Sequence, residues 1–154
     1  MSKMMLPSPG LSPVNGKALS ARFDGGALTS DAGLLALREV ERRLDVAGRL
    51  ATGIDDPRDP TRTVHSVADI LRFRLLLIAA GYEDGIDANA LRADPVFKLA
   101  LERLPGGRDL CSQSTISRLE NLPGRVALTR MMARLAGLLA GVASVCQACS
   151  TAWR

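Results

Sequence analysis

The first residues that could do chemistry are three aspartates in the segment GIDDPRDP, residues 53–60. Paired carboxylates serve phosphoryl transfer when a rigid scaffold holds two metal ions about 3.5 to 4 Å apart. Asp55, Asp56 and Asp59 instead lie beside two prolines, in a segment that must interrupt any helix. Aspartate is common beside proline and at helix starts. We therefore predict caps and a turn here, with a metal site as the alternative.

The other side chains that could act as ligands or nucleophiles are isolated. His65 has no histidine neighbour, and a metal site needs several convergent ligands. Cys146 and Cys149 have zinc-like or thioredoxin-like spacing, but no second Cys/His pair accompanies them and Cys111 is remote. The sequence thus predicts no catalytic residue, no metal ligand and no cofactor in this chain.

The segment SQSTISRLE, residues 112–120, combines polar side chains with a short expected helix. Such a helix can lie in the major groove, with Gln113 and Arg118 reaching base edges and Thr115 or Ser117 reaching phosphates. A tight helix-turn-helix joins its helices by about three or four residues. Here residues 105–114 separate them, so a capped surface helix remains the alternative.

All of the net positive charge lies in the last quarter of the chain. The formal net charge is +4, and up to Cys111 the 15 basic and 15 acidic side chains balance. Beyond it, five arginines accompany only one acidic residue, Glu120. A basic face favours nucleic acid, although it also serves as a solubilising surface. The residues predicted to contact DNA are Gln113, Thr115, Arg118, Arg125, Arg130 and Arg134.

Cysteine usage and hydropathy indicate the cellular compartment in which the chain should lie. Three cysteines form no even disulfide framework and the N-terminus does not resemble a secretory signal, which predicts the cytoplasm. The longest apolar run, residues 75–80, is far below the about 18 residues that a membrane-spanning helix needs. We expect no membrane role.

Helical periodicity dominates after residue 22. Residues 1–22 are rich in proline, glycine and serine and predict a flexible leader. No convincing strand pattern and no internal repeat follow. The sequence predicts an all-α bundle of about five to seven helices. The expected helices are 30–49, 66–80, 87–93, 94–104, 114–121 and 126–142.

Three of these helices have predicted faces. The helix 66–80 is apolar almost all round and should lie at the centre of the bundle. The first helix should bury Leu34, Leu37, Val40 and Leu44. Its opposite face should expose Arg38, Glu41, Arg42 and Arg49. The last helix carries an apolar seam at spacings of three and four: Leu128, Met131, Leu135, Leu138 and Val142.

Five blocks between residues 23 and 121 resemble, in order, the N-terminal region of DDE transposases of bacterial insertion sequences. They read FDGGALTSDAGLLALRE, IDDPRDP, FRLLLIAAGYED, LRADPVFKLAL and DLCSQSTISRLEN. The resemblance implies a protein that binds the DNA ends of its element and cuts and joins strands. It also implies two Asp and one Glu in an RNase H-like domain, with Mg²⁺ or Mn²⁺.

In that family the carboxylates follow the helical opening, the first on a hydrophobic strand just beyond the helix matched here by 126–142. This chain instead reads ASVCQACSTAWR over 143–154, and no acidic residue follows Glu120. No catalytic residue of the family can be carried over. The hypothesis is a truncated transposase with a leader at 1–22, a helical domain at 23–143, a divergent, out-of-frame tail at 144–154, and no RNase H-like domain.

We expect the chain to serve transposition by DNA-end binding or assembly, and to be incapable of strand transfer alone because it lacks metal-binding carboxylates. The alternative is an interaction module whose seam pairs with a second copy or with full-length transposase and inhibits it. A third interpretation, an independent small enzyme, would need Asp55, Asp56 and Asp59 as its acids.

Overall fold

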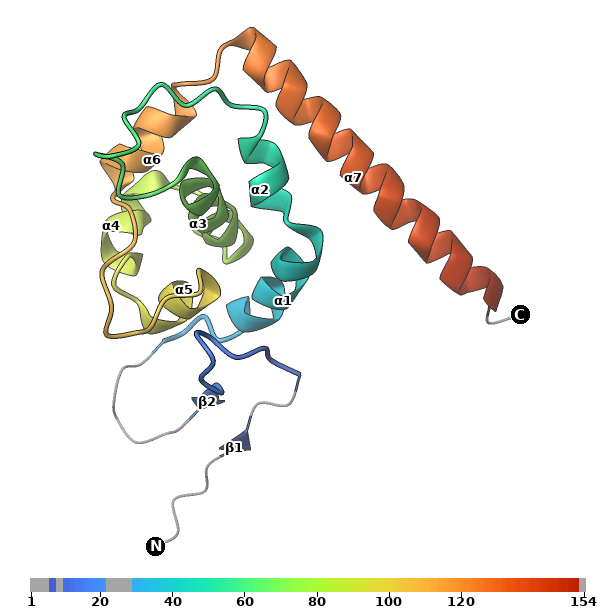
Figure 1. Ribbon diagram of the computed structural model, residues 1–154. Helices are drawn as coiled ribbons and strands as arrows, with labels where there is room; N and C mark the ends of the chain where they lie inside the picture. Colours follow the sequence, from blue (N-terminus) through green and yellow to red (C-terminus); the bar gives the residue numbers. More distant parts are fainter. Residues whose placement is uncertain (1–5, 8–9, 22–28, 153–154) are drawn as a thin grey trace, which may run out of the picture.

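The computed structural model describes residues 6–7, 10–21 and 29–152, with side chains for 10–20 and 29–143. The described residues confirm the all-α prediction. In Figure 1 the helices α1, α2, α4, α5 and α6 surround α3, and α7 extends along one edge of the molecule. The elements are β1 Leu6–Pro7, β2 Ser20–Ala21, α1 Leu34–Leu44, α2 Val46–Ala51, α3 Val67–Ala79, the 3₁₀ helix η1 Gly85–Asp87, α4 Ala88–Leu91, α5 Pro95–Ala100, α6 Gln113–Glu120 and α7 Arg125–Ala152.

The central helix α3 is where the sequence places it. The Ser66 hydroxyl accepts the Asp69 N–H at 3.0 Å, which satisfies a backbone donor that the helix start leaves open. Gly81 follows the helix with φ +92°, a conformation that favours glycine. Phe73 packs edge-to-face on Phe97 of α5, with ring centroids 5.6 Å apart. The aliphatic core gathers around this pair.

The single helix expected at 30–49 is wrong: the structure forms α1 and α2. Asp45 adopts a left-handed conformation with φ 48° and ends α1, and α2 begins at the next residue. Aspartate tolerates this conformation better than most side chains. Ser30 does not cap the helix, since its hydroxyl donates to the Asp31 carboxylate and Gly33 is the N-cap.

The predicted faces of α1 are wrong in part, although Leu34 is buried and Arg42 is exposed as expected. Arg38, expected in solvent, has a side chain only 1% exposed, whereas Leu37 and Val40 are exposed. Partners far away in the sequence explain the exchange, because Arg38 donates to the carbonyl oxygens of Ser12 and Pro13 and to the Glu102 carboxylate. A buried guanidinium with its donors satisfied is tolerated where an unpaired one is not.

The described part of the leader packs on this helix. Val14 is fully buried, and the Ser12 N–H and hydroxyl donate to the Glu39 carboxylate at 2.9 and 2.7 Å. Asn15 and Gly16 both have positive φ in a tight turn between Val14 and Lys17. The two-residue strands β1 and β2 pair in antiparallel register, Leu6 with Ala21.

Two helix boundaries differ from expectation. Asp94 caps α5 as predicted, accepting the N–H groups of Val96 and Phe97, but α5 ends at Ala100 rather than 104. Glu102 has φ 59°, which stops the helix, and its carboxylate accepts hydrogen bonds from Arg38 and Arg42. Helix α6 begins at Gln113, because Ser112 takes the extended N-cap conformation two residues before the expected cap at Ser114.

Helix α7 is longer than the expected 126–142 and continues to Ala152, through most of the predicted tail. It approaches the body at Gly53, where an added Cβ would lie 3.1 Å from the Met131 backbone nitrogen. Of the seam residues, Leu138 is 7% exposed and Met131 packs against the core. Leu128, Leu135 and Val142 are exposed. The seam is therefore covered only in part.

Among the described residues one stretch, Arg125–Ala143, is long and apolar enough to cross a membrane by length and composition, with a hydropathy of 1.4 and 11% of it buried. The longest uninterrupted apolar run missed it because Thr129, two arginines and two glycines divide this stretch. Arginine at the centre of a spanning helix is costly, and Arg130 and Arg134 fall within the stretch. Length and composition alone are weak evidence that this helix crosses a membrane.

Candidate nucleic-acid interface

Helix α6 presents one face to the core and one to solvent. Ile116 and Leu119 are buried on the side that meets α3, and Ser114 and Arg118 are exposed on the other. The Ser112 hydroxyl lies 3.1 Å from the Thr115 hydroxyl, which orders the start of the helix. The sequence predicts this amphipathic arrangement, and the structure leaves the polar side open.

The predicted contact residues on α6 differ in their availability. The Gln113 side chain donates along the helix to Ser117 Oγ at 3.2 Å, and its backbone N–H donates to Asn89 Oδ1. Thr115 is half-buried and Arg118 is exposed. Together with Arg58 from the loop before α3, Thr115 and Arg118 line a hollow of about 230 Å³. These two are the predicted residues that the structure brings together.

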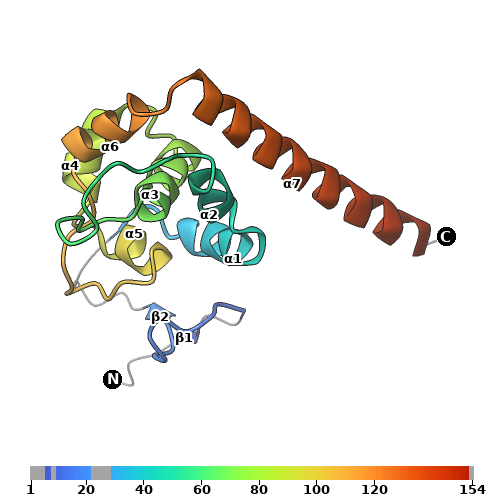
Figure 2. The same ribbon diagram turned by 45° about the horizontal axis from the view of Figure 1, so that its top comes forward.

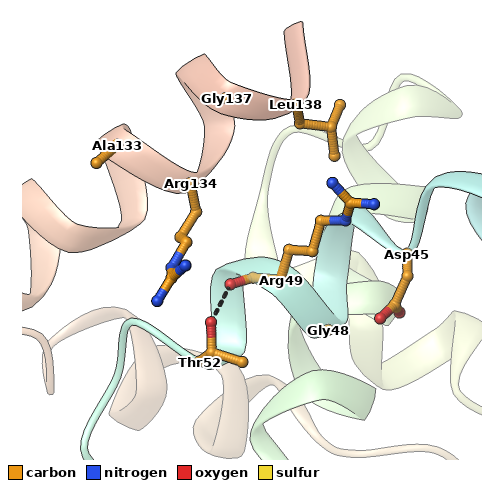
Figure 3. Close-up of a pocket in the computed structure, with 8 residues that line it drawn as sticks. All are labelled: Asp45, Gly48, Arg49, Thr52, Ala133, Arg134, Gly137 and Leu138. Carbon is orange, nitrogen blue, oxygen red and sulfur yellow. Dashed lines mark hydrogen bonds between the residues drawn. The ribbon is translucent and has the colours of Figure 1, made fainter. Parts of the chain in front are cut away.

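Two of the predicted arginines of α7 lie near α2 and the loop that follows it. Arg125 is exposed at the start of the helix. Arg130 is held by Asp55, with Nη1 at 3.1 and 3.0 Å from its two carboxylate oxygens. Arg134 projects toward α2 (Figure 3). Their role in DNA contact stays a prediction.

A second hollow, of about 550 Å³, lies between α2 and α7. Figure 3 shows Arg49 and Arg134 entering it from the two helices, with Leu138 above Arg49. The Thr52 hydroxyl donates to the Arg49 carbonyl at 2.7 Å. Asp45 adds a carboxylate to the same wall, so the charge here is mixed.

The aspartates of residues 55–59 serve the turn, as the sequence predicts. Asp56 accepts two side-chain hydrogen bonds of 2.7 Å from Arg58, which lower the pKa of its carboxyl group. Asp59 accepts from the hydroxyl and N–H of Thr61, and these bonds lower its pKa. Asp56 and Asp59 thus have local partners, whereas Asp55 binds Arg130, 75 residues away.

Such a donor set does not fit the Mg²⁺ or Mn²⁺ that the family resemblance implies. The carboxylates of Asp55, Asp56 and Asp59 already bind an arginine or a threonine rather than converging. Within residues 10–20 and 29–143, no group of three His, Cys, Asp or Glu side chains could hold a metal ion. The side chains of Cys146 and Cys149 lie outside the described residues, as does Arg154.

Sequence reasoning missed the basic residues of the loop before α3. Arg58 and Arg62 line a hollow of about 350 Å³ together with His65 and, from α6, Thr115. Burial lowers the pKa of His65, and the nearby charges of Arg103, Arg108 and Arg92 lower it further against the opposing effect of Asp69. A positive potential therefore surrounds this histidine.

Residues 11–148 match the sequence model of the family described as Transposase DDE domain group 1. Because the match covers most of the chain, the protein is one of the DDE transposases. Within that class it belongs to group 1 of the transposase DDE domain. Membership confirms the resemblance to DDE transposases and places the chain in DNA transposition, with DNA as its partner class. Neither curated proteins nor solved structures gave a match.

Proposed function

We propose that this chain is the helical end-binding part of a cytoplasmic insertion-sequence transposase. The observation that carries the proposal is the open polar side of α6, where Arg118 is exposed beside Thr115 on a helix fixed to the core by Ile116. A rigid helix with such an exposed face suits the major groove. Family membership supplies the DNA partner.

Binding to the terminal DNA of the element tests this proposal, with a scrambled duplex of equal length as the competitor. We expect tighter binding to the true end. The log–log salt slope should be about −0.9 per phosphate contact. Equal binding to both duplexes would contradict sequence reading by α6.

Two variants sharpen the test. Arg118→Ala should weaken binding to the true end by about tenfold, the loss of one good base contact. Arg43→Ala is the matched control, because Arg43 is exposed on α1 and has no ion pair among the described residues. In Figures 1 and 2, α1 and α6 lie on opposite sides of α3. An equal loss in both variants would indicate only nonspecific attraction.

We further propose that this chain does not transfer strands by itself. The carboxylate partners described above support this, since Arg130, Arg58 and Thr61 occupy the acidic cluster. Incubation of the purified chain with its DNA end and Mn²⁺ should give neither nicked nor joined products. Products that vanish when Asp55, Asp56 and Asp59 are changed to Ala would overturn the proposal.

A second candidate function is assembly through α7. Exposed apolar side chains follow this helix, and Met132 is 71% exposed. A contiguous apolar surface of this kind marks an interaction site. We expect the chain to form dimers, or mixed oligomers with full-length transposase, through α7.

Sedimentation analysis over a wide concentration range tests assembly. The wild-type mass should rise with concentration, and Leu135→Glu should remain a monomer because a charge then replaces an apolar contact. Arg43→Ala again serves as the control. A strict monomer at high protein concentration would remove this candidate.

A further inference from the structure

Two hollows adjoin between the 58–65 segment and α6, and together they form what we call the loop groove. They share Arg58 and Thr115 on their walls, so they lie side by side between the loop and the helix. The larger hollow has Arg62 and His65 on its walls. A ligand that fills both must offer different chemistry at its two ends.

The larger hollow is basic. Arg62 is exposed and makes no ion pair among the described residues, which leaves its guanidinium available to an anion. Asp59 is the acidic residue that lines this hollow, and its carboxylate accepts hydrogen bonds from the N–H and hydroxyl of Thr61. Arg58 is held in place by two bonds to Asp56. A planar guanidinium in a fixed position suits a phosphate group.

The other arginines near His65 differ in whether a carboxylate neutralises them. Arg103 and Arg92 pair with Asp69 and Asp109, respectively. Arg108 is exposed and has no ion pair among the described residues. The balance around His65 is therefore positive, and an anion bound there would be stabilised.

The smaller hollow is mostly apolar. Leu119 and Leu122 line it, and the side chains of Arg58 and Arg118 lie on its walls. Double-stranded DNA offers this hollow only thymine methyl groups as apolar contacts, since the faces of its bases are stacked inside the duplex. An unpaired base exposes its faces, and arginine planes and apolar side chains are suitable stacking partners for it.

We propose that the loop groove binds an unpaired DNA strand, with a phosphate beside Arg58 and Arg62 and the adjacent base against Leu119 and Leu122. This inference rests on the proposed DNA-binding function and goes beyond it, because it assigns a strand form and adds Arg58, Arg62, Leu119 and Leu122 to the site, which shares Thr115 and Arg118 with the polar face of α6.

Fluorescence anisotropy with the full chain provides the binding test, using a single-stranded oligonucleotide from the element's end and the matched duplex. Arg62→Ala should weaken single-strand binding about tenfold and reduce the salt slope by about 0.7, the loss of one phosphate contact. Arg43→Ala should leave both unchanged. Equal helical circular dichroism in all three proteins verifies folding.

An abasic oligonucleotide of the same length tests the apolar hollow separately. Removing the bases keeps every phosphate, so weaker binding of the abasic strand is expected if Leu119 and Leu122 hold a base. Equal affinity of the two strands would overturn the placement of a base in the groove.

His65 is the sole histidine of the chain and reports on the groove directly by NMR. A phosphate beside it should raise its pKa, because a negative charge stabilises the imidazolium form. The groups facing this ring are Arg58, Arg62, Arg92, Arg103, Arg108, Asp59 and Asp69. The single strand should shift the imidazole resonances in wild type and in Arg43→Ala, and shift them less in Arg62→Ala.

The outcomes separate the two proposals. Sequence-selective duplex binding, with His65 unmoved by the single strand and Arg62→Ala equal to Arg43→Ala, would overturn the loop groove and leave the end-binding function intact. Binding to neither DNA form would overturn both.

Discussion

Among single residues, Arg38 determines how the leader meets the helical body. Its five N–H donors are all used: two bond Glu102, one bonds Glu39, and two reach the backbone carbonyls of Ser12 and Pro13. One buried side chain thereby joins three separate parts of the chain. The left-handed backbone of Glu102 carries a strain of about 1 kcal/mol or more, which these bonds offset.

Replacing Arg38 should be severely destabilising. Arg38→Met keeps the bulk of the stem but leaves the carbonyl groups of Ser12 and Pro13 without this donor and removes one donor residue from the carboxylates of Glu39 and Glu102. We expect the free energy of unfolding to fall by about 3 kcal/mol, the usual cost of removing one partner from a buried charged network. Urea denaturation measures it. Arg43→Ala should stay within about 0.5 kcal/mol of wild type, and a similar small effect for Arg38→Met would contradict this account.

Acid should weaken the same junction. The hydrogen bonds from Ser12 hold the pKa of Glu39 below its ordinary value of 4.5. Burial would raise the pKa of Glu102, but the bonds from Arg38 and Arg42 outweigh it and lower the pKa. A carboxyl group whose pKa is lower in the folded state stabilises the fold above its unfolded pKa. That contribution is lost as the pH falls through the folded value.

Stability should therefore decline as the pH drops below about 4.5, the unfolded value of both glutamates. Denaturant midpoints at successive pH values measure the decline. Glu39→Gln should be less stable than wild type near pH 7 and should lose less stability on acidification. An acid dependence identical to wild type would exclude Glu39 as a source.

At the scale of helices and turns, local signals predict well and distant partners do not. The caps of α3 and α5 depend on Ser66 and Asp94, whose partners lie within three residues, and both predictions are confirmed. The burial of Arg38 depends on Ser12 and Glu102, 26 and 64 residues away. Hydrophobic periodicity contains no information about such partners, so it assigned this arginine to solvent.

In the candidate interface too, features set by local spacing could be predicted and features set by distant partners could not. The polar face of α6 can be derived from residues 112–120 because helical spacing alone separates Ile116 and Leu119 from Arg118. The contribution of Arg58 and Arg62 could not, since no local pattern shows that their loop lies beside a helix some fifty residues later. The sequence signal for this contribution was the presence of Arg58 and Arg62 in a proline-containing loop. A turn already accounts for polar residues in such a loop, so they were not predicted as contacts.

The attachment of α7 can be tested by two glycines with opposite expectations. At Gly53 an added Cβ would lie 3.0 Å from Met131 Cγ and 3.1 Å from its backbone nitrogen, so Gly53→Ala must push α7 outward. We expect a loss of about 1 kcal/mol in the free energy of unfolding. Gly137→Ala meets nothing within 4 Å and should gain about 1 kcal/mol from helix propensity.

Hydrogen exchange of α7 amides distinguishes the cause. Gly53→Ala should accelerate exchange in α7 more than in α3, because the contact it disturbs lies between Gly53 and Met131. Uniform acceleration across both helices would indicate global destabilisation instead and would contradict a local attachment at Gly53.

The molecule as a whole consists of a core around α3 and a long helix that is covered on part of one side (Figure 1). The core brings together residues from α1, α3, α5 and α6, with the aromatic pair Phe73 and Phe97 at its centre. Such contacts between distant parts of the chain should be lost together on unfolding. The exposed apolar side chains of α7 remain for a partner.

Cys111 makes this cooperativity measurable. Its side chain is 3% exposed, and burial raises the pKa of the thiol to about 11 from 9.0. Because the thiolate is the reactive form, the folded protein should react slowly with maleimide at pH 8. In a chain with Cys146→Ser and Cys149→Ser, labelling should accelerate with urea in parallel with the loss of helical circular dichroism. Labelling well below that transition would instead show that the region around α6 opens by itself.

The stability of the fold at alkaline pH tests whether the core closes over Cys111. A thiol whose pKa is higher in the folded state stabilises the fold below its unfolded pKa of 9.0, and this stability is lost as the pH rises toward about 11. Cys111→Ala should remove that part of the alkaline decline, at the cost of a small cavity beside Leu110 and Ile116. An unchanged decline between pH 9.0 and about 11 would mean that the thiol meets solvent in the folded state, and that the core does not close over Cys111.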